Sequence, residues 1–180
     1  MRRLLPLLAP LALVVACKGP QVPSPLVGQT RYLCCNLHFE KTRTTDMNPQ
    51  VGTLIPVGTP VTILEVYKDA VKIGPTGFPE IEIAHKYGRR TESMDAFMDH
   101  WFVEQDPKRT MRRYTAKMQK AIEAGTVEPG MTRDQVLMAI GYPPAHETPS
   151  LASPQWTYWR NRWDRFVVYF DGDKVARVVN

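Results

Sequence analysis

Cysteine and histidine are the residues of this chain best suited to catalysis, because a thiolate beside an imidazole makes a good nucleophile. Cys34 and His38 are the one such pair close together in the sequence. Four residues apart on a strand, they share a face but lie about 13 Å apart, which is too far for direct proton transfer. His85, His100 and His146 do not show metal-ligand spacing, and there is no phosphate-binding or dinucleotide-binding motif. We therefore predict no catalytic residue, no metal site and no cofactor.

A third cysteine, Cys17, has chemistry of its own because of the segment before it. Residues 1–16 carry two arginines directly after Met1, continue as an apolar run too short to cross a bilayer and end in a small residue, which predicts a signal peptide. The stretch Val14-Val15-Ala16-Cys17 resembles the lipobox of bacterial lipoproteins, whose cysteine is acylated and becomes the new N-terminus. Two or more acyl chains anchor a protein stably. The alternative is an ordinary secretory signal with an incidental cysteine.

The residues after the cysteine bear on location and reach. Among lipoproteins that this leader resembles, an aspartate after the cysteine favours the inner membrane, whereas here Lys18 follows. The resemblance therefore implies the periplasmic face of a bacterial outer membrane. Residues 17–29 are rich in proline and glycine, which predicts a flexible tether.

The two adjacent cysteines, Cys34 and Cys35, have few ways to bond. Neighbouring cysteines rarely form a disulfide with each other, because the ring is strained. On a continuous strand from Arg31 to Phe39 they point to opposite faces, which makes Cys35 a small core residue. Cys34 then shares the other face with Asn36, either exposed and able to pair with another chain or buried as a free thiol.

The richest run of aromatic and arginine residues, the types that dominate interface hot spots, lies between residues 156 and 165. Trp156 and Tyr158 point to one face of their strand and Trp159 to the other. One set should pack on the helices, while the other meets a partner or is covered by the N-terminal module. The candidate interface residues are Trp156, Tyr158, Trp159, Arg160, Arg162, Trp163 and Arg165, together with Arg112 and Arg113.

The charge of the chain is mild. The formal net charge is +5, and Arg2 and Arg3 of the leader contribute two of these units. This argues against a dedicated nucleic-acid-binding protein. Cations cluster within residues 86–90, 108–120 and 160–165, as solvated helix faces often do. The alternative is contact with anionic phospholipid headgroups near the anchor.

Residues 30–90 read as a small β module, with short apolar runs bounded by Gly, Pro or Asp. The segment 52–61 resembles the entry of small SH3-like barrels. Residues 91–111 then predict a linking amphipathic helix that ends before Pro107 and either closes the β module or packs the two modules together. The apolar face of this helix comprises Met94, Phe97, Met98, Trp101 and Phe102.

Residues 112–180 predict two helices followed by three antiparallel strands. Thr115 caps the first helix, which ends at Gly125. Thr132 and Gln135 form a capping box at the start of the second. The turn at residues 171–173 predicts a hairpin between the last two strands.

These residues carry a family resemblance. The pattern Gly130, Met131, Thr132, Gln135, Val136, Gly141 and Pro143, followed by Trp156, Tyr158, Phe170, Asp171, Lys174 and Val175, resembles the BamE family, also called SmpA/OmlA. Its members are small outer-membrane lipoproteins of the β-barrel assembly machinery. The same unit resembles the modules of β-lactamase inhibitory proteins. The expected fold is α+β, an SH3-like β module plus a BamE-like domain over residues 112–180.

Together these features predict a noncatalytic, lipid-anchored adaptor or scaffold in β-barrel assembly or envelope maintenance. The resemblance implies an envelope protein as partner, with anionic phospholipid as a further ligand and no nucleic acid. Two alternatives stay open. One is an inhibitor or sensor of a periplasmic enzyme, and the other is a cell-wall-binding module that works through the SH3-like part.

Overall fold

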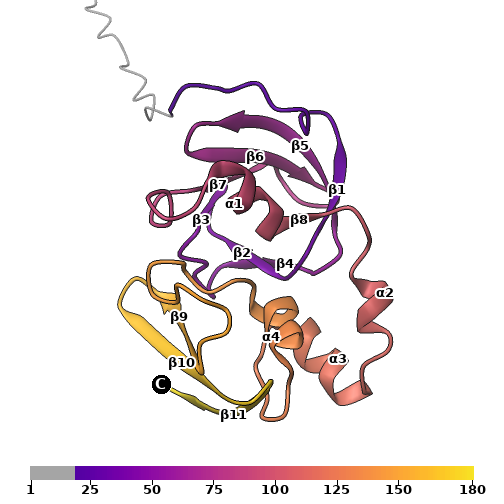
Figure 1. The fold of residues 1–180 in the computed structure, drawn as a ribbon. Helices are drawn as coiled ribbons and strands as arrows, with labels where there is room; N and C mark the ends of the chain where they lie inside the picture. The colour runs from indigo at the N-terminus through magenta and orange to yellow at the C-terminus, as the bar shows by residue number, and fades with distance from the viewer. Residues whose placement is uncertain (1–18) are drawn as a thin grey trace, which may run out of the picture.

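The computed structural model describes residues 19–180, so Cys17 and the predicted leader lie outside the described residues. Over this range the chain is α+β, as the sequence predicts, and its two halves lie one above the other in Figure 1. We call residues 19–106 the N-terminal half and residues 107–180 the C-terminal half. No helix among the described residues is both long and apolar enough to cross a membrane.

A curled six-stranded sheet is the frame of the N-terminal half (Figure 1). The strands of this half are β1 (Thr30–Leu33), β2 (Leu37–Phe39), β3 (Arg43–Thr45), β4 (Thr53–Ile55), β5 (Pro60–Tyr67), β6 (Ala70–Pro75), β7 (Ile81–Ala84) and β8 (Phe102–Val103). The sheet order is β3-β7-β6-β5-β1-β8, antiparallel except between β3 and β7. The pair β2 and β4 forms a separate antiparallel ladder.

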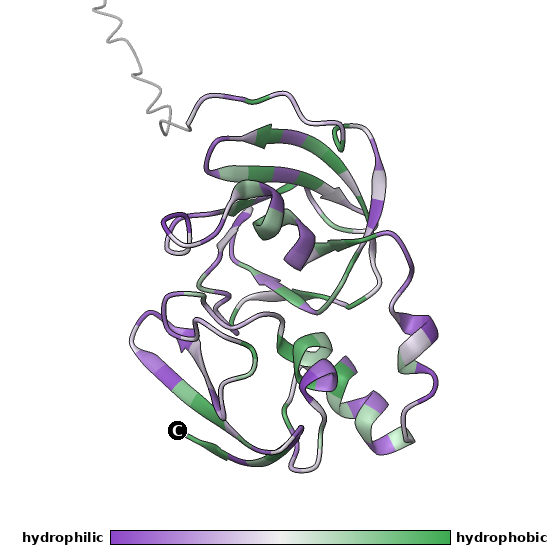
Figure 2. Cartoon of the chain, in the orientation of Figure 1, coloured by the Kyte–Doolittle hydropathy of each residue, from purple (hydrophilic) through white to green (hydrophobic). Residues whose placement is uncertain are grey.

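Period-two alternation builds the core of this half, because successive strand residues point to opposite faces. Apolar and polar residues alternate along β5 and β6 in Figure 2. Ile63, Ile73 and Ile83 are fully buried, and α1 (Met94–Trp101) adds Phe97 to the same core. The predicted apolar helix face is therefore core.

The predicted linking helix over residues 91–111 is shorter than expected. Ser93 accepts a hydrogen bond from Ala96 N at 3.2 Å and starts α1, which ends at Trp101. Phe102 then becomes extended and pairs with Leu33, because this covers an edge of the sheet that would otherwise be unpaired. A second short helix, α2 (Lys108–Met111), follows.

The predicted tether over residues 17–29 is not free of the fold in its described part. Val22 N donates to Val66 O at 2.9 Å, and Gly28 N donates to Ile63 O at 2.8 Å. Val22 and Leu26 pack against the core. These two apolar side chains hold residues 20–28 along β5, which the proline content alone did not reveal.

The predicted continuous strand from Arg31 to Phe39 is broken at the two cysteines. Cys34 and Cys35 are joined by a disulfide, contrary to the expectation that adjacent cysteines do not bond. Cys35 is fully buried, as predicted, whereas Asn36 is buried rather than on an open face. The bend sends β1 and β2 into different sheets and turns Asn36 toward the C-terminal half.

Helices on one side of an antiparallel sheet form the C-terminal half. Its elements after α2 are α3 (Ala116–Glu123), α4 (Arg133–Ile140), β9 (Gln155–Asn161), β10 (Asp164–Asp171) and β11 (Lys174–Val179), with sheet order β11-β10-β9. The predicted cap at Thr115 and the capping box of Thr132 with Gln135 are both confirmed. The predicted hairpin between β10 and β11 is confirmed as well.

Among the residues of the pattern that begins at Gly130, several shape turns or fill this core. Met131 and Val136 are fully buried, and Gly130 N donates to Val175 O at 2.8 Å. Gly141 ends α4 with a φ of 74°, which favours glycine. A Cβ at this position would lie 2.7 Å from Asn48 Nδ2, so glycine is also needed for the close approach of the N-terminal half.

Amide side chains of the N-terminal half join the two halves by capping the helices of the C-terminal half. Asn36 Nδ2 donates to Ala139 O at 2.9 Å and to Ile122 O at 2.5 Å, while its backbone N donates to Met138 O at 3.0 Å. Asn48 Nδ2 donates to Ile140 O at 2.5 Å. Since the three carbonyls of α4 lie at its C-terminus, they have no partner within that helix. Ile122 O, in α3, also accepts from Gly125 N at 3.0 Å.

Replacing Asn36 with Ala should lower the free energy of unfolding by roughly 2–4 kcal/mol, because it leaves the carbonyl of Ala139 without a donor and the buried Val57 N without an acceptor. Chemical denaturation measures this loss. Gln105→Ala, at an exposed position, is the matched control and should change little. An Asn36→Ala protein as stable as the control would contradict the role of the side chain in the joint.

Candidate functional site

The alternation predicted for β9 is present, and it divides the candidate interface residues. Trp156 and Tyr158 are fully buried against α4, so they are core residues and cannot meet a partner. Trp156 Nε1 donates to Leu151 O at 3.2 Å, and Tyr158 Oη donates to Gly141 O at 2.9 Å. Burial raises the pKa of the Tyr158 phenol well above its usual value. The prediction that Trp156 and Tyr158 belong to an interface is therefore wrong.

Trp159 points to the other face of the sheet and meets the N-terminal half. Its carbonyl accepts a hydrogen bond from Gln50 N at 3.1 Å, and its indole is half-buried. The sequence left open whether this face meets a partner or is covered by the N-terminal half. The N-terminal half covers part of Trp159. The rest of the ring faces a cavity.

The tip of the β9–β10 hairpin places Trp163 in solvent. The Asn161 carboxamide oxygen accepts hydrogen bonds from the backbone N of Trp163 and of Asp164, which closes the turn. Trp163 is 80% exposed, the largest exposure among the large apolar side chains of the described residues. The Arg162 guanidinium lies 4.8 Å from its ring centroid.

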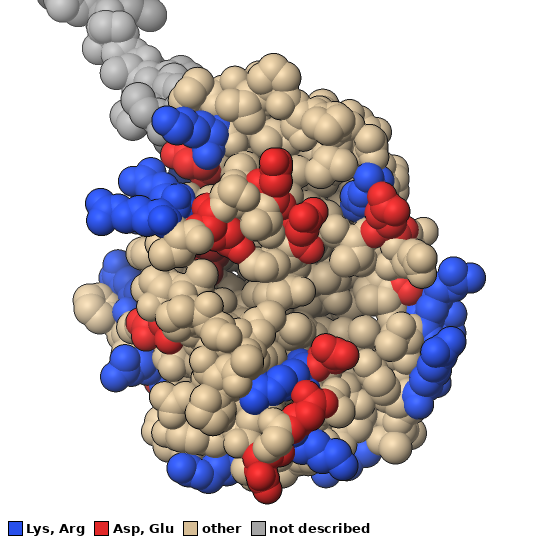
Figure 3. Space-filling model, viewed as in Figure 1, with Lys and Arg blue, Asp and Glu red and all other residues tan. Residues whose placement is uncertain are grey.

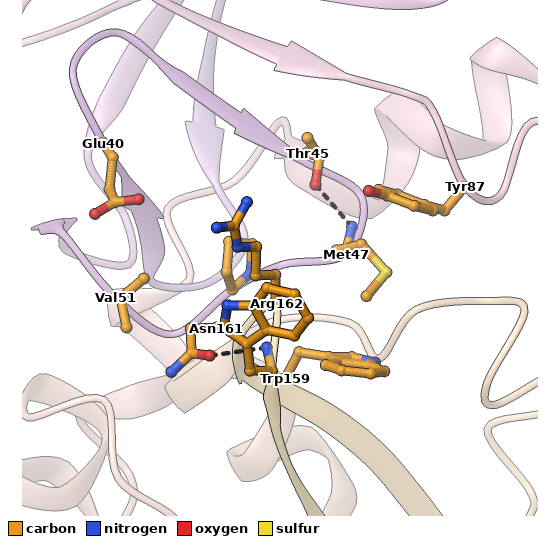
Figure 4. A pocket seen from close by; sticks show the side chains of 10 residues that line it. Glu40, Thr45, Met47, Val51, Tyr87, Trp159, Asn161 and Arg162 are labelled. Carbon is orange, nitrogen blue, oxygen red and sulfur yellow. Dashed lines mark hydrogen bonds between the residues drawn. The ribbon is translucent and has the colours of Figure 1, made fainter.

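A cavity of about 500 Å³ opens between this hairpin and loops of the N-terminal half. In Figure 4, Thr45, Met47 and Tyr87 form one side, and Trp159, Asn161 and Arg162 form the other. We call this cavity the aromatic groove. Its lining residues are Glu40, Thr45, Met47, Pro49, Val51, Tyr87, Trp159, Asn161, Arg162 and Trp163.

A buried carboxylate, Asp46, positions the N-terminal wall of the aromatic groove. It accepts hydrogen bonds from Tyr87 N at 2.9 Å and from Gly88 N at 2.7 Å. Its Oδ2 also lies 3.0 Å from His85 Nδ1, and the His85 ring stacks on Phe97 at 4.5 Å. The loop that carries Tyr87 is thereby held against the loop that carries Met47.

The pKa values of this pair shift in opposite directions. Burial alone would raise the pKa of Asp46, but the hydrogen bonds from His85, Gly88 and Tyr87 outweigh it and lower that pKa. Burial alone would lower the pKa of His85, but its hydrogen bonds with Asp46 and the Glu92 carbonyl outweigh it and raise that pKa. The charged pair is therefore favoured in the folded protein.

The remaining predicted arginines lie in three places. Arg162 and Arg165 are exposed at the hairpin. Arg160 is engaged within the fold, since it lies 3.2 Å from the Asp164 carboxylate and 5.1 Å from the Phe166 ring centroid. Arg112 and Arg113 are exposed after α2 and do not line the aromatic groove. Lysine and arginine side chains gather on the right of Figure 3, where Figure 1 shows α2. Cys17 lies outside the described residues.

Sequence reasoning missed the N-terminal half of this site. Met47 and Tyr87 come from loops without periodicity, and Asn36, Asn48 and Gln50 act on atoms far along the chain. A weak signal exists in residues 44–50, where Thr, Asp, Asn and Pro favour a turn-rich loop. Loops with such structure often carry function.

Compared with protein-family models, with curated proteins and with solved structures, the chain gives no significant match. The assignment of the candidate site therefore rests on geometry alone. The site is an apolar cavity with aromatic walls that is open to solvent beside an exposed tryptophan. Such a cavity is suited to taking up an apolar group of a partner.

Replacing His85 with Gln should reduce stability more near pH 5 than near pH 8. The raised pKa of folded His85 makes its contribution complete below its unfolded pKa of about 6.5, and this contribution is lost as pH rises through the folded value. The lowered pKa keeps Asp46 ionised across this window. Urea denaturation at both pH values measures the difference between the two proteins.

His38 does not confuse this comparison. Burial lowers its pKa, so its own contribution is lost as pH falls, and it is present in both proteins. A stability difference that grows from pH 5 to pH 8 would contradict the assignment of the Asp46–His85 pair.

Proposed function

We propose that this chain is a noncatalytic lipoprotein, anchored through acylated Cys17 to the periplasmic face of a bacterial outer membrane, that acts as an adaptor or scaffold. It binds an envelope protein through the aromatic groove. The observation that carries the proposal is the pairing of a cavity of about 500 Å³ with Trp163, whose ring is 80% exposed beside it. Exposed tryptophan next to a preformed pocket is typical of protein interfaces.

The likeness of both halves to known folds is part of the same proposal. Support for an SH3-like N-terminal half comes from its curled sheet, in which β1, β5, β6 and β7 follow one another and β8 returns beside β1. Support for a BamE-like C-terminal half comes from the order of α3, α4 and a three-stranded meander, with the capping box at Thr132. Assembly of outer-membrane β-barrels is the setting that this likeness favours.

The docked segment before β1 limits how far the protein stands from its anchor. Residues 20–28 lie along β5, so the two residue steps between Cys17 and Gly19 span at most about 7 Å. The described chain begins beside the turn between β5 and β6, and the C-terminal half lies at the opposite end (Figure 1). An anchored chain would therefore hold its N-terminal half near the membrane and extend its C-terminal half into the periplasm.

A photoreactive amino acid at position 163 should crosslink the lipidated protein to an envelope protein in cells, and mass spectrometry of the adducts identifies it. The matched control is the same probe at position 113, which is exposed after α2 on the other side of the molecule. Cys17→Ser should leave an unprocessed or soluble chain and reduce the adduct at position 163. In the barrel-assembly setting the adducts contain subunits of that machinery.

Three results would contradict the proposal. Equal adducts at positions 163 and 113 would remove the aromatic groove as the binding surface. Adducts with a soluble enzyme or with peptidoglycan alone would favour the inhibitor or the cell-wall alternative. A Cys17→Ser chain that stays firmly membrane-bound would remove the anchor.

A further inference from the structure

We propose that the aromatic groove and the basic grooves beside it bind an extended, acidic polypeptide segment that carries one large apolar side chain. This inference rests on the proposed function and names the chemistry of its partner. It combines three observations: an apolar cavity, a groove that continues beyond it, and cations around both.

The cavity suits one bulky side chain. Its walls are mostly apolar, with Trp159 and Trp163 from the hairpin and Met47 from the N-terminal half. A thioether adapts to differently shaped apolar groups, and aromatic rings offer large contact areas at low entropic cost. Because Asp46 and Gln50 fix the walls through hydrogen bonds, the cavity is formed before the partner arrives. Preformed walls favour binding, since little ordering is left to complete.

The groove continues along the N-terminal half past this cavity. Two further cavities, of about 700 and 470 Å³, adjoin it, and Thr45 lines all three. They follow the chain through β3 and on to the segment after β7. Three cavities that adjoin one another accommodate an extended chain better than a single compact molecule.

The charges around the three cavities favour an acidic chain. Five cationic and three carboxylate side chains line the cavities. The cations are Lys41, Arg43, Lys86, Arg89 and Arg162, and the carboxylates are Glu40, Asp69 and Glu82. Arg43 pairs with Glu82 at 3.2 Å. Lys41, Lys86, Arg89 and Arg162 have no carboxylate within 4.0 Å among the described residues. Opposite charge on the partner would speed association and set its register.

A lipid surface is the other anionic partner to weigh, and the shape of the site disfavours it. The three cavities are concave, whereas a bilayer presents a broad flat surface. The chain enters the fold beside the turn between β5 and β6, next to the cavity of about 470 Å³ at Asp69 but away from the aromatic groove at the β9–β10 hairpin (Figure 1). Protein is therefore the partner that the geometry favours.

Fluorescence anisotropy with a defined peptide tests the inference on the lipidated full chain in neutral detergent micelles. The probe is a labelled nine-residue peptide with a central phenylalanine flanked by glutamates. Two matched peptides replace the phenylalanine with glycine or all glutamates with lysines. We expect saturable binding of the acidic phenylalanine peptide at low salt and at least about tenfold weaker binding of both matched peptides.

Charge-reversal variants locate the site. Lys86→Glu combined with Arg162→Glu should weaken binding about tenfold, whereas Arg112→Glu combined with Arg113→Glu, an equal charge change after α2, should not. All four positions are exposed, so the fold should tolerate these changes. A shift of tryptophan fluorescence that saturates with the peptide, and is reduced in Trp163→Phe, reports occupation of the aromatic groove.

Each other result overturns the inference. No saturable binding of the acidic peptide, equal binding of the lysine peptide, or equal losses in the two charge-reversal variants would each exclude an acidic segment at this site. Two results together would reassign the site to lipid: the glycine peptide binds as tightly as the phenylalanine peptide, and phosphatidylglycerol vesicles displace the bound peptide whereas phosphatidylcholine vesicles do not. If the acidic peptide does not bind but position 163 forms a specific protein adduct in cells, this inference is wrong and the proposed function stands. If the peptide binds but no such adduct forms, the groove binds acidic segments and the proposed function is wrong.

Discussion

The C-terminus of α4 leaves four backbone carbonyls without partners inside the helix, and the way they are satisfied sets the relation between the two halves. The first, Leu137 O, accepts from Gly141 N at 2.7 Å within the C-terminal half. The other three accept from the N-terminal half: Met138 O from Asn36 N, Ala139 O from Asn36 Nδ2 and Ile140 O from Asn48 Nδ2. Hydrogen bonds are directional and these groups are buried, so a displaced joint would leave several polar groups unpaired at once. The apolar side chain of Val57, which enters the core of the C-terminal half, adds contact area to this joint.

The aromatic groove is a consequence of that joint. One wall belongs to loops of the N-terminal half and the other to the β9–β10 hairpin, and Gln50 N joins them at Trp159 O. Gln50 Nε2 also donates to Ile140 O at 3.1 Å, so the capping of α4 and the placement of the groove share a residue. Neither half alone would present this cavity. The binding surface that we propose therefore exists only when both halves are folded and joined, and its shape depends on the rigidity of the joint.

Features that depend on neighbours in sequence could be predicted, and features that depend on distant partners could not. The capping box at Thr132 and the alternation that buries Trp156 and Tyr158 follow from local periodicity. The buried role of Asn36 could not be predicted, because its side-chain partners lie 86 and 103 residues away. The same holds for residues 20–28, whose prolines suggested a free tether although Val22 and Leu26 pack on the core. The hairpin side of the candidate site could be predicted from its run of aromatic and arginine residues. Met47 and Tyr87 could not, because they lie in loops where no periodicity indicates which side chains line a cavity.

If capping of α4 by the N-terminal half holds the molecule together, the two halves must lose their structure together. Differential scanning calorimetry of the protein measures this directly. Our account predicts a single transition for which the van't Hoff and calorimetric enthalpies agree, as expected of one cooperative unit. Two separated transitions, or a calorimetric enthalpy well above the van't Hoff value, would show that the halves unfold independently and would contradict the account.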